Sequence, residues 1–185
     1  MKKINTCLII IILICGFFTI IFNDQKNVVV FLKDASIVFT ILLPYIFEKV
    51  TKRSLNDVFK TIWIIFIIMA HYLGVILEFY NIYPGYDKVT HCMSGFLTAY
   101  VGYMMVDKIK SKNNFINAII IVSFSALCAV SWEIFEFTCN IFFGGDAQRV
   151  AETGVDDTMW DMIVALIGAT IFSMCSVMCK KSDQN

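Results

Sequence analysis

Six long apolar segments constrain the fold of this chain more than any other feature of its sequence. They cover residues 4–22, 28–47, 58–77, 89–106, 115–137 and 158–179. Crossing about 30 Å of hydrocarbon takes roughly 20 helical residues, and each segment meets or approaches that length. Hydrophobic residues make up 58% of the chain and charged residues 16%, against about 45–50% and about 25% in soluble domains. The sequence therefore predicts an all-α fold, with a single integral membrane domain over residues 1–185 and about six transmembrane helices.

The distribution of Lys and Arg predicts how these helices are oriented. Eleven of the 15 Lys and Arg residues fall in the N-terminus, the second-to-third connection, the fourth-to-fifth connection and the C-terminal tail. The remaining four lie on the opposite side of the predicted helices. Because Lys and Arg are enriched in cytoplasmic loops, both termini are expected in the cytoplasm, an N-in/C-in arrangement.

Two features argue against a secreted, disulfide-linked protein. The apolar run that follows the N-terminal lysines has no small-residue cleavage site, so this segment is interpreted as a membrane anchor. The seven cysteines are odd in number, and most lie inside apolar segments, as expected of packing residues.

The formal net charge is zero and no nucleic-acid motif is present, which excludes nucleic acid as an expected partner and leaves the lipid bilayer.

Ionisable residues gather at the predicted outer ends of four helices. They are His71 and Glu78 on the third, Asp87 and His91 on the fourth, Glu133 and Glu136 on the fifth, and Asp157 and Asp161 on the sixth. Each pair has a spacing that keeps both side chains near one face of a helix. On three of these helices the same face continues inward with glycine, alanine or threonine, which lets transmembrane helices approach closely. The acidic and histidine side chains are therefore expected to converge inside the bundle.

A cluster of this kind predicts a bound cation or shared protons. A carboxylate at membrane depth costs roughly 2.5–3.5 kcal/mol, and several together repel one another unless protonated, paired or bound to a cation. The expected ion is Zn²⁺, Mn²⁺ or Mg²⁺. Its predicted ligands are His91, Asp161, Glu136 and Asp157. Glu133 is the predicted general base, Asp87 is a second catalytic residue or a further ligand, and His71 and Glu78 are additional candidates.

Structural roles for the same residues stay open. Asp87 and Asp157 suit the first turn of a helix, where the helix dipole favours acids, and Glu133 and Glu136 could mark a helix end in headgroup water. Three functions follow as alternatives. One is a metal- or proton-dependent envelope enzyme that acts on a lipid headgroup or lipid-linked substrate. The others are a cation- or proton-coupled transporter and a non-catalytic membrane scaffold.

Three ordered motifs carry a resemblance to a known family. They are Tyr86-Asp87-Lys88-x-x-His91-x-x-x-Gly95, Trp132-Glu133-Ile134-Phe135-Glu136, and Asp157-Thr158-x-Trp160-Asp161-Met162 followed by Gly168-Ala169. Together with Pro44 and Glu78, they resemble the YjdF family of uncharacterised bacterial inner-membrane proteins. The resemblance covers most of the chain after the first helix and implies a multi-pass protein of the bacterial cytoplasmic membrane.

A more distant similarity is to VanZ-like proteins, which are associated with glycopeptide resistance and the cell envelope. Their pattern is Asp-Lys-x-x-His, then Glu on a helix, then Asp-x-x-x-Asn-x-x-Gly. Here Ala165 stands where that pattern has Asn. The similarity implies a role at the cell envelope and supports the six-helix layout.

Overall fold

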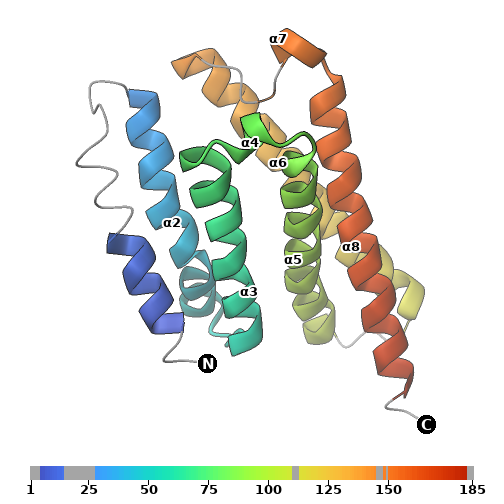
Figure 1. Ribbon diagram of the computed structural model, residues 1–185. Helices are drawn as coiled ribbons and strands as arrows, with labels where there is room; N and C mark the ends of the chain where they lie inside the picture. Colours follow the sequence, from blue (N-terminus) through green and yellow to red (C-terminus); the bar gives the residue numbers. More distant parts are fainter. Residues whose placement is uncertain (1–4, 15–27, 110–112, 145–147, 149, 183–185) are drawn as a thin grey trace. The chain divides into compact units, whose positions relative to one another are not determined.

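The described part of the chain is helical throughout. The computed structural model describes all residues except 1–4, 15–27, 110–112, 145–147, 149 and 183–185. The elements are α2 (Val28–Thr51), α3 (Asp57–Ile67), the π-helix η1 (Ile68–Ile76), α4 (Phe79–Ile82), α5 (Tyr86–Ile109), α6 (Asn114–Phe143), α7 (Val150–Thr153) and α8 (Asp156–Ser182) (Figure 1). A short apolar helix covers Asn5–Ile14, and the rest of the first predicted segment, residues 15–22, lies outside the described residues. The predicted all-α fold class is confirmed.

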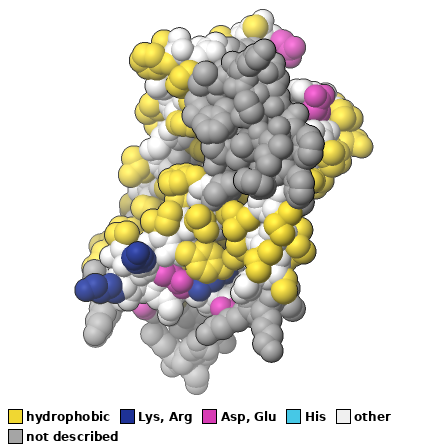
Figure 2. All heavy atoms as spheres, turned by 90° about the vertical axis from the view of Figure 1, so that its left-hand side faces the viewer, with side chains coloured by type: hydrophobic (Ala, Val, Ile, Leu, Met, Phe, Trp, Pro, Cys, Tyr) yellow, Lys and Arg dark blue, Asp and Glu magenta, His cyan; other side chains and the backbone are white. Residues whose placement is uncertain are grey.

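Within the described residues, three helical stretches are long and apolar enough to cross a membrane. They are Asp57–Ile76, Asn114–Phe143 and Asp156–Ser176. Large hydrophobic side chains such as Phe115, Leu127 and Phe142 are exposed along α6, and hydrophobic side chains cover much of the face drawn in Figure 2. Such a surface suits contact with lipid.

The chain divides into two compact units, Met1–Ile82 and Tyr83–Asn185. Unit 1 has a core of Ile12, Ile41, Ile64 and Ile67. In it, Asn56 caps α3 by accepting a hydrogen bond from the backbone N–H of Phe59 at 2.7 Å. The side chain at an N-cap supplies an acceptor that the helix itself lacks.

The third predicted helix, 58–77, is not a uniform α-helix. It is α-helical to Ile67 and then becomes the π-helix η1, where the backbone N–H of Leu77 bonds to the carbonyl of Tyr72 at 3.0 Å. A left-handed φ of +58° at Glu78 follows the end of this helix. π-Helical turns have no simple hydropathy signature, so the pattern of apolar residues could not distinguish them from α-helix.

Unit 2 is built from α5, α6 and α8, which pack pairwise against one another. A Cβ added at Gly95 would collide with the backbone carbonyl of Ala165, and one added at Gly168 would collide with the carbonyl of Cys92. The two glycines therefore allow α5 and α8 to approach backbone to backbone. The prediction that small residues mark the packing face is confirmed for this pair of helices.

Helix α6 is longer than predicted. It continues past residue 137 to Phe143 and ends at Gly144, which has a φ of +74°. A residue with positive φ is a common helix stop, and glycine adopts it without steric cost. Glu133 and Glu136 consequently lie inside α6, so the interpretation of these two residues as helix-end markers is wrong.

Candidate metal centre

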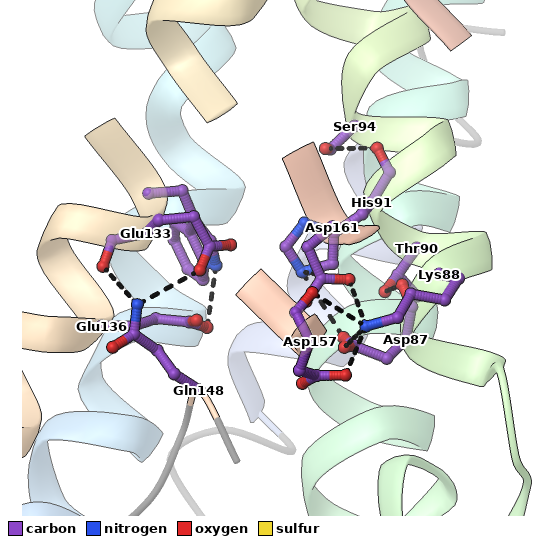
Figure 3. A network of polar contacts seen from close by, with 11 residues as sticks. Asp87, Lys88, Thr90, His91, Ser94, Glu133, Glu136, Gln148, Asp157 and Asp161 are labelled. Carbon is purple, nitrogen blue, oxygen red and sulfur yellow. Dashed lines mark hydrogen bonds and ion pairs between the residues drawn. The ribbon is translucent and has the colours of Figure 1, made fainter. Parts of the chain in front are cut away.

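The candidate site is formed where α5 and α8 begin. Asp87 and Lys88 lie in the first turn of α5, and His91 follows one turn later. Asp157 lies in the first turn of α8 and Asp161 in the second. The close approach of the two helices brings these five side chains together (Figure 3).

Lys88 is at the centre of this group. Its Nζ lies 2.5 Å from Oδ1 of Asp157, 2.7 Å from Oδ1 of Asp161 and 3.3 Å from Oδ2 of Asp87. Asp161 is only 3% exposed, so its charge needs such partners. One ammonium group, with three N–H donors, thus contacts three carboxylates.

His91 completes a three-residue group whose potential ligand atoms are close enough together to hold a metal ion. Its Nε2 lies 3.4 Å from Oδ1 of Asp87 and 3.8 Å from Oδ1 of Asp161. One potential ligand atom from each of Asp87, His91 and Asp161 lies within 4.8 Å of the others. Among the described residues, these three form the group of His, Cys, Asp or Glu side chains that could hold a metal ion. One imidazole and two carboxylates form a mixed nitrogen and oxygen donor set suited to Zn²⁺ or Mn²⁺.

Two more carboxyl groups belong to α6. Glu133 is 5% exposed. Its backbone carbonyl and Oε2 both accept hydrogen bonds from Nε2 of Gln148, at 3.1 and 3.3 Å. Its other oxygen, Oε1, is buried without a hydrogen-bond partner. Glu136 accepts a hydrogen bond from Nε1 of Trp132 at 2.9 Å and is close enough to His91 for their charges to interact.

The balance of charge in unit 2 favours a cation. Among the described residues of unit 2, five carboxyl groups occur with two basic side chains: Asp87, Asp157 and Asp161 lie around Lys88 and His91, Glu136 lies near His91, and Glu133 lies near Glu136. Lys88 can balance the charge of one carboxylate, and His91 that of one more when protonated. The remaining negative charge is held where water is scarce, and it would be relieved by a bound divalent ion or by protons.

The predicted ligands occupy different positions relative to the three-residue group. His91 and Asp161 belong to it, and Asp87, predicted as catalytic, joins them. Asp157 contacts Lys88, while Glu136 stands on α6 beside Trp132.

His71 and Glu78 belong to unit 1. There, His71 lies in η1, with its Nε2 3.3 Å from Oγ1 of Thr40. Glu78 is exposed and adopts the left-handed backbone conformation.

Two contributors were missed in the sequence. Lys88 enters the sequence analysis only as part of the Tyr86-Asp87-Lys88 motif, and its position next to Asp87 is the signal that could have pointed to it. Gln148 gave none, because a lone glutamine 15 residues beyond Glu133 in an irregular connection has no pattern that predicts a contact.

Comparison with known proteins places the chain among membrane proteins. A family model described as "Predicted membrane protein (DUF2238)" matches residues 5–182. An uncharacterised protein of Thermotoga maritima is 26% identical over 140 residues, which cover 75% of this chain and 70% of the relative. No solved structure matches the chain.

Proposed function

Since this chain belongs to the predicted membrane protein family DUF2238, we propose that it is a multi-pass protein of the bacterial cytoplasmic membrane that binds a divalent metal ion. The ion would serve a reaction on a lipid headgroup or a lipid-linked substrate at the extracytoplasmic surface. The resemblance to the YjdF family agrees with this membership. The similarity to VanZ-like proteins is consistent with a role at the cell envelope.

The proposed topology has six transmembrane helices with both termini in the cytoplasm. In unit 2, the candidate site lies where α5 and α8 begin, whereas Lys108 is near the opposite end of α5. In unit 1, Lys49, Lys52 and Arg53 cluster around the end of α2. Placing these basic ends in the cytoplasm, as the positive-inside preference requires, puts the candidate site at the extracytoplasmic face.

One observation carries the metal proposal: the ligand atoms of Asp87, His91 and Asp161 converge within 4.8 Å. They come from two helices joined by a reciprocal glycine contact, so the group is held by the packing of the bundle. Acids that act only as helix caps need not meet an imidazole from their own helix and a carboxylate from another. Buried ionisable residues inside a membrane bundle commonly mark functional sites.

The chemistry of such a site divides among the chain's own residues. Asp87, His91 and Asp161 would hold the ion, which when bound supplies a Lewis acid and lowers the pKa of coordinated water. Glu133 would accept a proton, and its buried Oε1 has no hydrogen-bond partner, which supports that role. Gln148 fixes the other oxygen of that carboxylate by its hydrogen bond.

The test is the metal content and metal affinity of the purified protein. Wild type is expected to bind about one Zn²⁺ or Mn²⁺ per chain, and Asp161→Asn and His91→Gln are expected to weaken binding at least a hundredfold, because each removes a ligand. Asp156→Asn is the matched control. Asp156 neighbours Asp157 in the first turn of α8 but is exposed, so its loss should leave the affinity unchanged.

Folding of each variant is checked by its thermal unfolding in detergent. Absence of metal binding in wild type, even with added Zn²⁺ or Mn²⁺, would refute the metal proposal and favour the scaffold hypothesis, in which the acids only stabilise helix contacts. Equal loss of affinity in Asp156→Asn would show that general negative charge, and not this group of ligands, attracts the ion.

Proton or cation transport is the second candidate, and the buried face of α6 favours it. Asn117, Ser125 and Glu133 are all buried on this helix, so polar side chains occur along much of its length. Polar groups inside the bundle can line an ion path. Flux of protons or Mn²⁺ into liposomes, abolished by Glu133→Gln, would favour transport over headgroup chemistry.

A further inference from the structure

Lys88 competes for the carboxylate that a metal ion would need. Oδ1 of Asp161 lies 2.7 Å from Nζ of Lys88 and 3.8 Å from Nε2 of His91. The carboxylate of Asp87 is shared in the same way, with Oδ2 toward Lys88 and Oδ1 toward His91. A cation placed among the three ligands would repel the ammonium group at this distance.

We propose that Lys88 and a divalent ion are alternative partners of Asp161, and that entry of the ion releases the Lys88 ammonium to bind an anionic substrate group beside it. This inference rests on the proposed metal site. It assigns Lys88 a substrate-positioning role that the motif alone does not predict. The substrate class is a phosphate monoester or diester.

The surroundings of Lys88 suit such an exchange. Its side chain is 27% exposed, against 5% for the side chain of Asp161, so the ammonium has access to the surface while the carboxylate does not. The lysine stem is flexible and can carry its charge to a nearby polar surface. Asp157, at 2.5 Å, is outside the three-residue group, so one N–H donor of the ammonium can stay with it while the donors released from Asp161 and Asp87 turn to the substrate.

The pairing of a metal ion with a freed ammonium selects phosphate chemistry. Both charges attract the oxygens of a phosphoryl group, and this combination is a recurring way to bind one. In the absence of the ion, Lys88 is committed to three carboxylates, so anion binding should depend on metal. A phospholipid headgroup and free phosphate share this chemistry.

The first test compares metal affinity in wild type and Lys88→Met. Methionine retains the length of the apolar stem but not the charge, so titration with Zn²⁺ or Mn²⁺ alone should show at least tenfold tighter binding in the variant. Unchanged or weaker binding in Lys88→Met, with wild type binding normally, would overturn the exchange and leave the metal site standing. Loss of binding in both proteins would instead refute the metal site on which the inference rests.

The second test uses wild type alone, so it does not depend on the variant folding. Amine-reactive labelling, read by mass spectrometry, should modify Lys88 several-fold faster after metal is added. Lys60 is the internal control, because it pairs with Glu48 at 2.7 Å in unit 1 and its labelling should not change. Labelling of Lys88 that is indifferent to metal would contradict the proposal.

The source of the phosphate is decided in the same assay. Inorganic phosphate is added in detergent, and in parallel the protein is reconstituted into vesicles with or without phosphatidylglycerol, always with metal. Protection of Lys88 by phosphatidylglycerol vesicles and not by phosphate indicates a lipid headgroup, and the reverse indicates a soluble phosphate. Protection by neither would overturn the anion-binding role.

Discussion

Each unit of this protein places a lysine among acidic side chains, and the two lysines differ in what surrounds them. In unit 1, Lys60 pairs with one carboxylate, that of Glu48, at 2.7 Å. Glu48 also accepts the backbone N–H of Leu55 at 2.7 Å, and the Lys60 ammonium lies 5.3 Å from the ring centroid of Tyr45. In unit 2, the Lys88 ammonium contacts three carboxylates, and a histidine and two further acids lie in the same cluster.

The difference distinguishes a structural ion pair from an unbalanced site. In unit 1, the ion pair between Lys60 and Glu48 matches one positive charge with one negative charge. Among the described residues, the unit 2 arrangement holds more carboxyl groups than basic side chains. Buried acids without matching bases cost free energy, so their retention in one place is better explained by a cation or proton that they bind.

The largest expected effect comes from separating the two helices that carry the unit 2 site. Gly95→Ala forces a methyl group onto the backbone carbonyl of Ala165, which is expected to destabilise unit 2 by about 3 kcal/mol and to abolish metal binding. Gly102→Ala is the graded control, because there the nearest atom, Cα of Ile121, would be 3.2 Å away and the cost should be at most about 1 kcal/mol.

Thermal or denaturant unfolding in detergent, together with metal titration, measures both variants. Equal effects of Gly95→Ala and Gly102→Ala would show that the close approach of α5 and α8 does not determine the site. The Lys60–Glu48 pair of unit 1 should be unaffected by either change, and labelling of Lys60 reports that directly.

Removing one acid from each unit should have opposite consequences. Glu48→Gln leaves the half-buried Lys60 without its carboxylate and is expected to cost about 1 kcal/mol. Glu136→Gln removes a charge from a cluster with too many, while the amide oxygen can still accept the hydrogen bond from Trp132. In metal-free protein its stability should therefore equal or exceed that of wild type.

Unfolding of the metal-free proteins in detergent decides between these expectations. If Glu136→Gln lost as much unfolding free energy as Glu48→Gln, the acids of unit 2 would be as well balanced by positive charge as the pair in unit 1. The contrast between the two lysines would then have no functional meaning.

Hydropathy and spacing predicted much of this molecule, for physical reasons that can be named. Long apolar runs predict helices because a backbone in lipid must satisfy its own hydrogen bonds. The four-residue spacing of Asp87 and His91, and of Asp157 and Asp161, predicted that each pair shares one face of its helix, because four residues make about one helical turn. The glycine at position 95 indicated where the helices meet.

The rest depended on contacts that no local pattern encodes. The predicted fifth helix ends at residue 137 because Glu133 and Glu136 interrupt the apolar run, but this run resumes beyond them and α6 continues to Phe143. Lys88 of α5 contacts two acids of α8, and this contact depends on how the two helices are aligned along their length. The helices lie about 70 residues apart in the sequence, so no local pattern predicts that alignment. The hydrogen bond from Gln148 to Glu133 joins two residues that no motif links in the sequence.

The smallest expected effect tests whether polar groups elsewhere in unit 2 are structural. Oγ of Ser125 lies 2.8 Å from Oγ1 of Thr98 and 3.0 Å from the carbonyl of Gly95, and the serine is 1% exposed. Ser125→Ala removes this contact between α5 and α6 and should cost about 0.6 kcal/mol, the average for such bonds in membrane bundles, with metal affinity unchanged.

Ser131→Ala is the matched control for that change. Ser131 lies on the same helix but is exposed, and its hydroxyl bonds only within the helix, to the carbonyl of Leu127 at 2.7 Å. Its replacement should leave stability as it is. If Ser125→Ala instead weakened metal binding tenfold while stability held, the inner polar contacts would be coupled to the acidic site. The functional region of unit 2 would then extend from the acidic site along the α5–α6 interface. That result would favour the transport hypothesis over headgroup chemistry, because a path for ions needs polar groups beyond the site itself.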